Sequence, residues 1–494
     1  MEHPLRVDEF NPAEVPPAPE IEAPALAPAP TAAAAPTPLP PLPNLPASDV
    51  LFLKPTDAHY ADYLTAANKR TQLSPSLRAV CKTEHAVAVM VDWVRSNDLG
   101  FAVRCGGHCY EGFSQSSDVV IDLRGLATIK VDKAAGTVTV GAGAALYPIY
   151  QALAAQGLAL AAGSCPTVGI SGHILGGGHG LLARSHGLTC DSLHQVTMID
   201  AQARTLQADD ATNADLFWAC HGGGGGSFGI ATQFVLNVFP LARALVFSVQ
   251  WTLSQARAAT LFAAWQAWAP NAPSNITSIM KVGPAGNGLI TLRCIGQSVG
   301  SEAELRTNLR PMLQLDAPSQ ALAVQSLSFL DAVKHFAGPI VYESVFMKAR
   351  SDYVLSPLGP AALQAMMAAV APIPTGGIAL LCDAYGGKIA DVAADATAFP
   401  RRAGTQFCIQ YYTSWARAAD TAAHVANVSK VYAAMRPYMP GASYVNYCDL
   451  DLPDFASAYW GTNLARLSAV KKAYDPQNVF HHAQSVPVGA EASV

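Results

Sequence analysis

Charged residues are scarce in this chain: they occupy 14% of its 494 positions, and the formal net charge is only −5. The Lys and Arg residues form no run or patch, which argues against contact with nucleic acid or an anionic membrane surface. Long apolar stretches are missing too, because proline, glycine or polar residues interrupt every window of about eighteen residues, the length that a transmembrane helix needs. With 51% hydrophobic residues, the chain still has enough apolar side chains for a sizeable core.

Cysteine pairs are also missing, since none of the ten cysteines lies in a CxxC motif. We therefore expect buried thiols in a reducing compartment rather than a disulfide framework. The first residues, MEHPLRVDEF, lack the basic start and apolar core of a secretory signal, so a cytoplasmic location is expected. Histidines and cysteines between positions 165 and 190 are mostly six to eight residues apart. Zinc sites prefer shorter ligand pairs, so no metal is expected.

The length of the chain exceeds what one hydrophobic core usually spans, so we expect two folded lobes. Residues 1–48 are rich in Pro and Ala and are predicted to form a disordered or polyproline-like tail. We assign residues 49–240 to a first domain and residues 241–445 to a second, in which helical and strand-like segments alternate. Residues 446–494 form a C-terminal segment that we expect to return to the first domain.

The spacing of apolar residues predicts individual elements. Val87, Met90, Val91 and Val94 recur at helical spacing within a predicted helix over 84–97. Further helices are expected at 146–157, 213–221, 255–268, 360–371, 420–438 and 462–474. Strands are expected at 101–104, 119–123, 128–131, 137–143, 196–200, 205–209, 290–295, 377–382 and 406–412. This pattern predicts an α+β fold whose second domain is an antiparallel sheet covered by helices.

Two glycine-rich segments could carry chemistry. The first, Arg104-Cys105-Gly106-Gly107-His108-Cys109, follows a predicted strand, and its glycines would let backbone N–H groups approach a phosphate closely. Taken alone, GGH is a common turn, and its histidine is more often a satisfied structural residue. The second segment runs from Cys165 to Gly180, and glycines this dense are predicted to form no stable helix or strand. Neither segment matches the P-loop or the dinucleotide-binding fingerprint.

Four segments in fixed order carry a family resemblance: RCGGHCYEGFS, CPTVGISGHILGGGHGLLARSHGLTCDSL, DLFWACHGGGGGSFGIAT, and YVNYCDLDL followed by YWGTNLARLSAVKKAYDPQNVF. Together they resemble the berberine bridge enzyme-like FAD-linked oxidases, which share the two-lobed vanillyl-alcohol oxidase fold with a PCMH-type FAD-binding domain. The resemblance spans about residues 54–487, nearly everything outside the Pro-rich tail. It implies an FAD-dependent oxidoreductase.

The resemblance also implies how FAD is held. It assigns covalent bonds from His108 to the flavin 8α-methyl group and from Cys165 to flavin C6. The glycine loops would hold the pyrophosphate, and Gly229 and Ile230 would line the adenine end. The full set of implied cofactor-binding residues is His108, Cys165, Arg104, Cys105, Gly106, Gly107, Val168, Gly169, Gly172, His173, Gly177, Gly178, Gly180, Gly229, Ile230, Asn446 and Tyr447. Cys105 and His221 depart from the usual Ser or Thr and Arg of the family.

The catalytic roles are implied by the same resemblance. Tyr447 matches the tyrosine that acts as base, and Asp383 matches an acidic partner that accepts its hydrogen bond. Without the family, a sheet tyrosine and a turn-forming aspartate would be the simpler interpretation. Val168 is a small residue of the kind that goes with oxygen access, and the run Gln410, Tyr411, Tyr412 and Trp415 either lines a substrate pocket or belongs to the sheet core.

These residues predict an oxidase of a small-molecule alcohol or carbohydrate that returns electrons to O2 and makes H2O2. The alternatives are a tailoring enzyme of secondary metabolism, a dehydrogenase that reacts poorly with oxygen, and a flavin-binding scaffold without turnover. The sequence predicts neither the identity of the substrate nor the oligomeric state.

Overall fold

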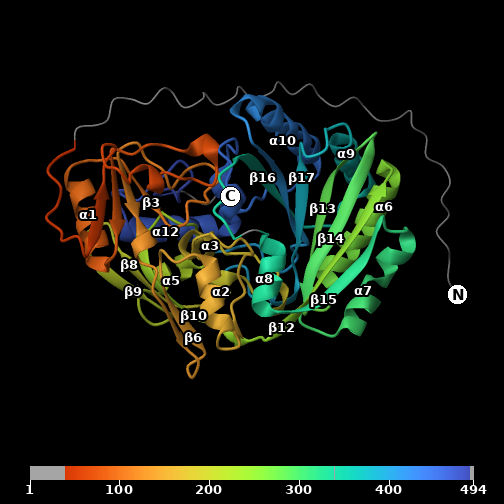
Figure 1. Cartoon of the computed structure of the whole chain (residues 1–494), viewed down its shortest axis with the longest axis horizontal. Coiled ribbons are helices and arrows are strands. Elements are labelled where there is room, and N and C mark those ends of the chain that lie inside the picture. The colour runs from red at the N-terminus through yellow and green to blue at the C-terminus, as the bar shows by residue number, and fades with distance from the viewer. Residues whose placement is uncertain (1–38, 339, 490–494) are drawn as a thin grey trace. The chain divides into compact units, whose positions relative to one another are not determined.

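The computed structural model describes residues 39–338 and 340–489. Its first lobe contains two sheets (Figure 1, left). One has the order β1-β2-β4-β3, with β2, β4 and β3 parallel. Its strands are β1 (Val50–Leu53), β2 (Leu77–Cys81), β3 (Phe101–Arg104) and β4 (Val119–Asp122). The other is antiparallel with the order β5-β6-β10-β8-β9. Its strands are β5 (Ile129–Asp132), β6 (Thr137–Gly141), β8 (Leu193–Ile199), β9 (Thr205–Ala208) and β10 (Ile230–Asn237).

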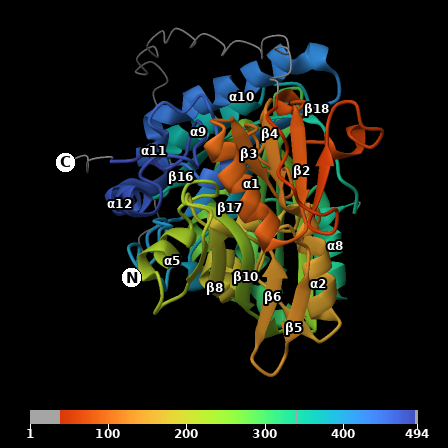
Figure 2. The same ribbon diagram turned by 90° about the vertical axis from the view of Figure 1, so that its left-hand side faces the viewer.

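Helices pack on these two sheets, as Figure 2 shows for α1 and α5. Helix α1 (Glu84–Ser96) begins where Thr83 accepts a hydrogen bond from the backbone N–H of Ala86, which satisfies a free donor of its first turn. Its buried side chains recur at helical spacing, as predicted. The other helices of this lobe are α2 (Leu146–Ala154), α3 (Ile170–Leu175), α4 (Ala183–His186) and α5 (Ala214–Cys220). A short pair, β7 (Leu158–Ala159) and β11 (Phe239–Pro240), leads out of the lobe.

The second lobe is a seven-stranded antiparallel sheet with the order β15-β12-β14-β13-β17-β18-β16. Its strands are β12 (Arg243–Leu253), β13 (Ile276–Gly286), β14 (Leu289–Ser298), β15 (Gln320–Ser328), β16 (Phe346–Val354), β17 (Ala379–Ala384) and β18 (Phe407–Trp415). Its helices are α6 (Gln255–Trp268), α7 (Glu302–Leu315), α8 (Phe329–Ala337), α9 (Pro360–Val370) and α10 (Thr421–Met435). Helices α6 and α7 lie on the side of the sheet away from β8 and β10 (Figure 1). The chain ends with α11 (Phe455–Trp460) and α12 (Leu464–Tyr474), and the predicted α+β class is confirmed.

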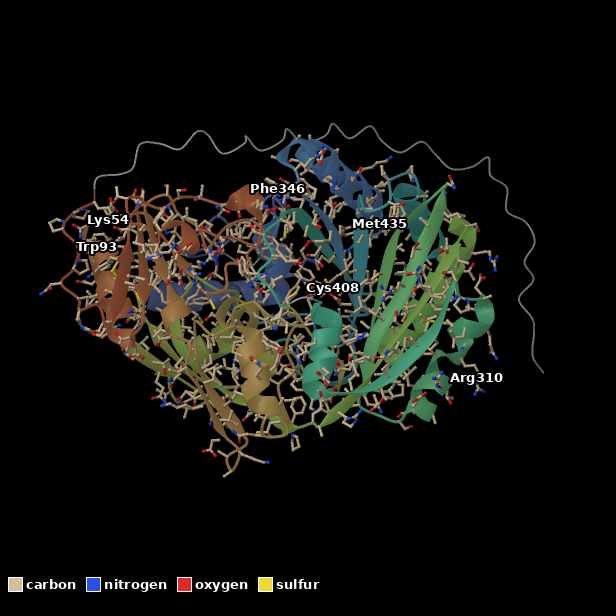
Figure 3. The ribbon with its side chains drawn as sticks, in the orientation of Figure 1. Lys54, Trp93, Arg310, Phe346, Cys408 and Met435 are labelled. Carbon is tan, nitrogen blue, oxygen red and sulfur yellow. The ribbon has the colours of Figure 1, made fainter. Side chains whose placement is uncertain are left out.

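Two large hydrophobic cores hold the described residues together. The first fills the lobe of α1 and β8, and the second lies between the seven-stranded sheet and α6, α7, α9 and α10. The segment 241–445 contributes to both cores, because α8 and Cys408 of β18 belong to the first. Figure 3 shows Cys408 near the middle of the described chain and Trp93 at its edge on α1. Among the described residues, every helix is too short or too polar to cross a lipid bilayer.

The structure corrects two predictions about local order. Residues 1–38 of the predicted tail lie outside the described residues, but Leu39, Leu42 and Leu45 pack against the first core. Trp93 Nε1 donates a hydrogen bond to the carbonyl of Pro41 at 2.9 Å. Residues 39–45 of the predicted tail are therefore held against the first core by specific contacts.

The second correction concerns the segment from Cys165 to Gly180, which contains a helix, α3, despite its glycines. Ile170, Ile174 and Leu175 of α3 are buried in the first core. Tertiary packing of this kind outweighs the weak helical propensity of Gly172.

Candidate active site

A cavity of about 470 Å³ lies among the loops of the first lobe and the seven-stranded sheet. Its volume is within the range of small-molecule and cofactor sites. Four stretches of chain form most of its wall: the turn after β3, the segment around α3, the glycine run before β10, and the turn over Tyr444–Cys448. Ile279, Leu381, Asp383 and Gln410 close it from the sheet. The cavity therefore combines backbone rich in glycine with side chains from the second lobe.

The two glycine-rich segments of the sequence meet at this cavity. A Cβ added at Gly106 would collide with the backbone of Gly169, and one added at Gly169 would collide with Cys105 Sγ. Gly107 has a φ of +70°, which a residue with a side chain rarely adopts. This contact brings the imidazole of His108 to Thr167, with Nε2 and Oγ1 2.9 Å apart. This hydrogen bond therefore links His108 to a residue that is only two positions after Cys165 in the sequence.

The environment of His108 keeps its imidazole neutral. Burial lowers the pKa of His108 to about 4, and the nearby charge of Arg104 contributes in the same direction. The ring also packs edge-on against Tyr342, with centroids 5.2 Å apart. A neutral imidazole retains a free nitrogen lone pair, which a nucleophile needs.

Cys165 is the only exposed cysteine of the ten, all of which the structure describes. Its accessible surface faces the cavity. Because the cavity walls displace bulk water, burial raises the pKa of the thiol, while Lys281 opposes this effect. An accessible thiol in the cavity wall is available to react with a group bound there.

Tyr447 and Asp383 form the polar contact at the other end of the site. The Tyr447 hydroxyl donates a hydrogen bond to Asp383 Oδ2 at 3.1 Å. Asp383 is buried on β17, and Tyr447 ends a 3₁₀ turn over Val445–Tyr447. Burial raises the pKa of Asp383, and burial together with the carboxylate holds the pKa of Tyr447 well above its usual value. The hydroxyl proton of Tyr447 is therefore retained until a partner accepts it.

Aromatic rings fix the orientation of Tyr447. Its ring stacks on Tyr110, with centroids 5.9 Å apart and planes 4° from parallel, and Tyr444 meets it edge-on at 4.9 Å. The Tyr444 hydroxyl accepts hydrogen bonds from the N–H of Gly178 at 2.9 Å and from Asn446 Nδ2 at 3.2 Å. Asn446 Nδ2 also donates to the carbonyl of His173 at 3.0 Å. The segment from Cys165 to Gly180 thus holds the turn over Tyr444–Cys448 by direct hydrogen bonds.

Matches to family models identify the family of the chain that forms this cavity. The model described as FAD binding domain matches residues 75–209, and the one described as berberine and berberine like matches residues 443–487. The uncharacterised FAD-linked oxidoreductase YgaK of Bacillus subtilis is 32% identical, over 87% of this chain and 95% of its own length. This chain belongs to the berberine bridge enzyme-like family of FAD-linked oxidoreductases.

Other members of the family agree with this assignment. Berberine bridge enzyme-like 4 of Arabidopsis thaliana is 30% identical, over 90% of this chain and 92% of its own. The solved structure of Physcomitrella patens BBE-like 1 superposes with a TM-score of 0.84 at 30% identity, covering 90% of this chain and 98% of that one. The predicted family, fold and FAD-linked oxidoreductase class are therefore confirmed.

The cavity of this family member fits a flavin nucleotide. A Cβ at Gly172 would meet no heavy atom within 4 Å, and one at Gly225 would meet only atoms 3.9 and 4.0 Å away. Both glycines line the cavity, so side chains there would occupy space that a ligand can use. The indole Nε1 of Trp460, also in the wall, is buried without a hydrogen-bond partner among the described residues. Glycine backbone and a free donor suit a large polar and aromatic ligand.

Most of the predicted cofactor-binding residues line this cavity. They are Cys105, Gly106, Gly107, His108, Cys165, Val168, Gly169, Gly172, His173, Gly180, Gly229, Ile230, Asn446 and Tyr447. Asp383 and Gln410 line it as well, whereas Tyr411, the next residue of β18, belongs to the second core. Alternation along a strand explains why Gln410 and Tyr411 have different environments.

Three predicted residues lie outside the cavity wall. Arg104 is the last residue of β3 and is not part of the cavity wall, although the other three residues of this strand are. Its guanidinium is buried near Asp122, with Nε 3.9 Å from Oδ2. Gly177 and Gly178 have φ of +108° and +82° and pack against Phe399 and Thr189. These two glycines shape the loop and, through the Gly178 N–H, position Tyr444.

Several wall residues escaped prediction. Tyr110, Tyr444 and the glycine run Gly224–Gly226 line the cavity, and so does His482 near the end of the chain. His482 stacks on Phe113 with ring centroids 4.4 Å apart, and its Nε2 lies 3.2 Å from the carbonyl of Gly225. The repeated tyrosine in YVNY and the five consecutive glycines of HGGGGG were the available signals.

Proposed function

We propose that this family member is an oxidase that carries FAD on two covalent bonds, to His108 and Cys165. Its substrate would be a sugar or another small molecule with a secondary alcohol, and O2 would be reduced to H2O2. When bound, FAD supplies the acceptor for a hydride from the substrate carbon and returns the electrons to O2. The observation that supports this proposal best is the hydrogen bond between Tyr447 and Asp383 in the cavity wall.

The protein must remove the hydroxyl proton of the alcohol while the carbon loses its hydride. Tyr447 cannot do so as a preformed phenolate, because burial and Asp383 raise its pKa. Transfer of the tyrosine proton to Asp383 solves this problem, since burial also raises the pKa of that carboxyl and makes it a better acceptor than an ordinary aspartate. The substrate hydroxyl then donates to Tyr447 as Tyr447 donates to Asp383.

The attachment residues have the properties that two bonds to a flavin require. His108 is neutral and Cys165 is accessible from the cavity, and a hydrogen bond joins His108 to Thr167, two residues from Cys165. Val168, also in the wall, is the small residue that the resemblance associates with oxygen access. Tyr110, Tyr447 and Gln410 provide aromatic faces and an amide at the sheet end, which suit a hydroxylated substrate.

A panel of sugars, oligosaccharides and aromatic alcohols, read for peroxide, tests the reaction. With a good substrate, Tyr447→Phe should lower kcat by about 100-fold or more, since general-base catalysis contributes about 10²–10⁴ in rate. The phenylalanine ring retains the stack with Tyr110, so KM should change little. Tyr438→Phe, at an exposed tyrosine, is the matched control. Full turnover in Tyr447→Phe would refute the base assignment.

Acid precipitation tests the two bonds to the flavin. The colour of the wild-type protein should remain with the pellet, and His108→Ala and Cys165→Ala should each retain it through the other bond. Only the double variant should release all flavin into the supernatant. Complete release from the wild-type protein would disprove covalent attachment.

A further inference from the structure

Two cysteines that are far apart in the sequence meet in the cavity wall. Cys109 Sγ and Cys448 Sγ are 3.7 Å apart, although 339 residues separate them in sequence. Cys109 follows the histidine of the GGH turn, and Cys448 follows Tyr447. Cys105, the sequence neighbour that could have competed for Cys109, instead donates its thiol to the carbonyl of Ala142 at 3.0 Å. The pair is therefore specific to Cys109 and Cys448.

A buried ion cluster holds the two cysteine-bearing segments together. Lys348 Nζ lies 2.7 Å from Glu111 Oε1 and 2.7 Å from Asp449 Oδ1. Glu111 is two residues after Cys109, and Asp449 directly follows Cys448. Arg350 Nε adds a contact to Asp449 Oδ2 at 2.6 Å. Since breaking a buried charge pair is costly, this cluster keeps the two thiols in contact.

The two thiols are chemically unequal. Cys109 Sγ lies 3.7 Å from Cys448 Sγ, where either thiol can be the donor, and it accepts a hydrogen bond at 3.3 Å from the backbone N–H of Phe113. A bond donated by Cys448 favours a thiolate on Cys109, as does the bond from Phe113, so the pKa of Cys109 is lowered, chiefly by Cys448, while that of Cys448 is raised. A thiolate beside a protonated thiol is the arrangement of an attacking and a resolving cysteine. Both residues line the cavity.

We propose that Cys109 and Cys448 are a peroxide-sensitive pair that forms a reversible disulfide across the active site. The oxidant is H2O2, which turnover would release if the function proposed above holds and which can equally be added from outside. The Cys109 thiolate attacks one peroxide oxygen and forms an S–O bond. The O–O bond breaks, hydroxide is the leaving group, and Cys109 becomes a sulfenic acid. The Cys448 thiol then displaces that oxygen as water. In total, two thiols lose two electrons and two protons, and one H2O2 becomes two H2O.

Closing this bond requires little movement. A disulfide has an S–S distance of about 2.05 Å, so the sulfurs must approach by roughly 1.7 Å from their observed separation. That movement acts on the residue next to Tyr447, whose 3.1 Å hydrogen bond to Asp383 depends on the position of the same turn. The oxidised enzyme should therefore turn over several-fold more slowly, and a thiol reductant should restore its rate.

Thiol mapping of the holoenzyme tests the pair without any substrate. The native protein is treated with a modest excess of H2O2, its free thiols are alkylated, and its peptides are identified by mass spectrometry. The expected result is a peptide that links Cys109 to Cys448, lost on treatment with dithiothreitol. If both thiols remain alkylatable while other cysteines oxidise, the proposal is overturned. This result does not depend on whether the protein is an alcohol oxidase.

Single variants assign the order of the two steps. Cys448→Ser should stop at a sulfenic acid on Cys109 that dimedone traps, whereas Cys109→Ser should leave Cys448 unmodified. Cys105→Ser is the matched control, because Cys105 also lines the cavity but bonds elsewhere, and the linked peptide should still form. Dimedone labelling of Cys448 in Cys109→Ser, at the rate of Cys109 in the other variant, would contradict the proposed order.

Discussion

Asp383 and Tyr447 share one proton in a buried environment, and this sets how activity should depend on pH. Asp383 must be ionised to accept the proton, and burial raises its pKa above the usual 3.8. Activity should therefore fall as the pH drops through that raised value, well before an ordinary aspartate would protonate. Above it, the rate should level off until another group titrates.

Asp383→Asn removes the carboxylate but keeps the shape of the side chain. We expect kcat/KM to fall by about 10-fold or more, since general acid–base groups contribute about 10²–10⁴ in rate. The acid limb that Asp383 causes in the wild type should also disappear. A pH profile of kcat/KM for both proteins checks this. An unchanged acid limb in the variant would assign it to a different group.

The contact between these two residues could be predicted only from the family resemblance. They are 64 residues apart, and nothing in CDAYGG distinguishes a catalytic carboxylate from a turn former. Arg104 shows the opposite case. The motif suggested that it contacts the cofactor, but its guanidinium packs against Gly107 and near Asp122, outside the cavity wall. A motif does not show which neighbours hold a long side chain.

Helix α3 packs its apolar side chains into the first core and borders open space at Gly172. Its apolar side chains are buried, and Gly172 borders the cavity with room beside its Cα. Gly172→Ala should therefore fold as well as the wild type and yet bind less flavin, because the methyl group projects into cofactor space. Gly359 is the matched control, since a Cβ there also meets nothing within 4 Å and Gly359 does not line the cavity.

The measurement is the ratio of flavin to protein, together with the Tm of the flavin-free proteins. We expect a several-fold lower flavin content in Gly172→Ala, with a Tm within a few degrees of the wild type. Equal flavin content in Gly172→Ala and Gly359→Ala would show that the ligand does not use this space.

Elements with a strong apolar period were predictable, and those stabilised by distant contacts were not. Helices α1, α6 and α10 lie within a few residues of the ranges expected from the sequence. Strand β13 was not predicted, because its GPAG end reads as a turn, yet it pairs with β14 along most of its length. Residues 39–45 were expected to be disordered or polyproline-like, and the surface around Trp93 against which their leucines pack could not be predicted from the sequence.

Three half-buried histidines make the flavin-free protein sensitive to acid. His108, His173 and His482 all line the cavity, and burial is the main cause that lowers the pKa of each to about 4. The unfolded chain binds these protons near pH 6.5, whereas the folded chain resists them until about pH 4. Stability should therefore be complete above pH 6.5 and should decline as the pH falls from there to about 4.

A series of Tm measurements on flavin-free protein between pH 7.5 and 4 checks this decline. His482→Gln should make the slope shallower, because one of the three groups is removed and the amide can still bond to the carbonyl of Gly225. His59→Gln, at an exposed histidine, should leave the slope unchanged. A flat profile in the wild type would show that other groups compensate.

The predicted boundary between residues 240 and 241 does not coincide with the division between the two hydrophobic cores. The α+β class and the two-lobed layout follow from composition and pattern, but α8 and Cys408 of the second segment pack in the first core. Lys471, near the end of the chain, donates to the carbonyl of Ser227 at 2.7 Å beside the glycine run. Such contacts cannot be seen in a linear pattern, because they depend on how the chain returns.

The wall of the cavity draws on residues from Phe101 to Gln484. A chain emerging from the ribosome has the GGH turn early, but Tyr447, Trp460 and His482 leave the exit tunnel long after it. The site cannot close around its flavin until these later segments have emerged. A nascent chain stalled before residue 443 should therefore carry no bound flavin.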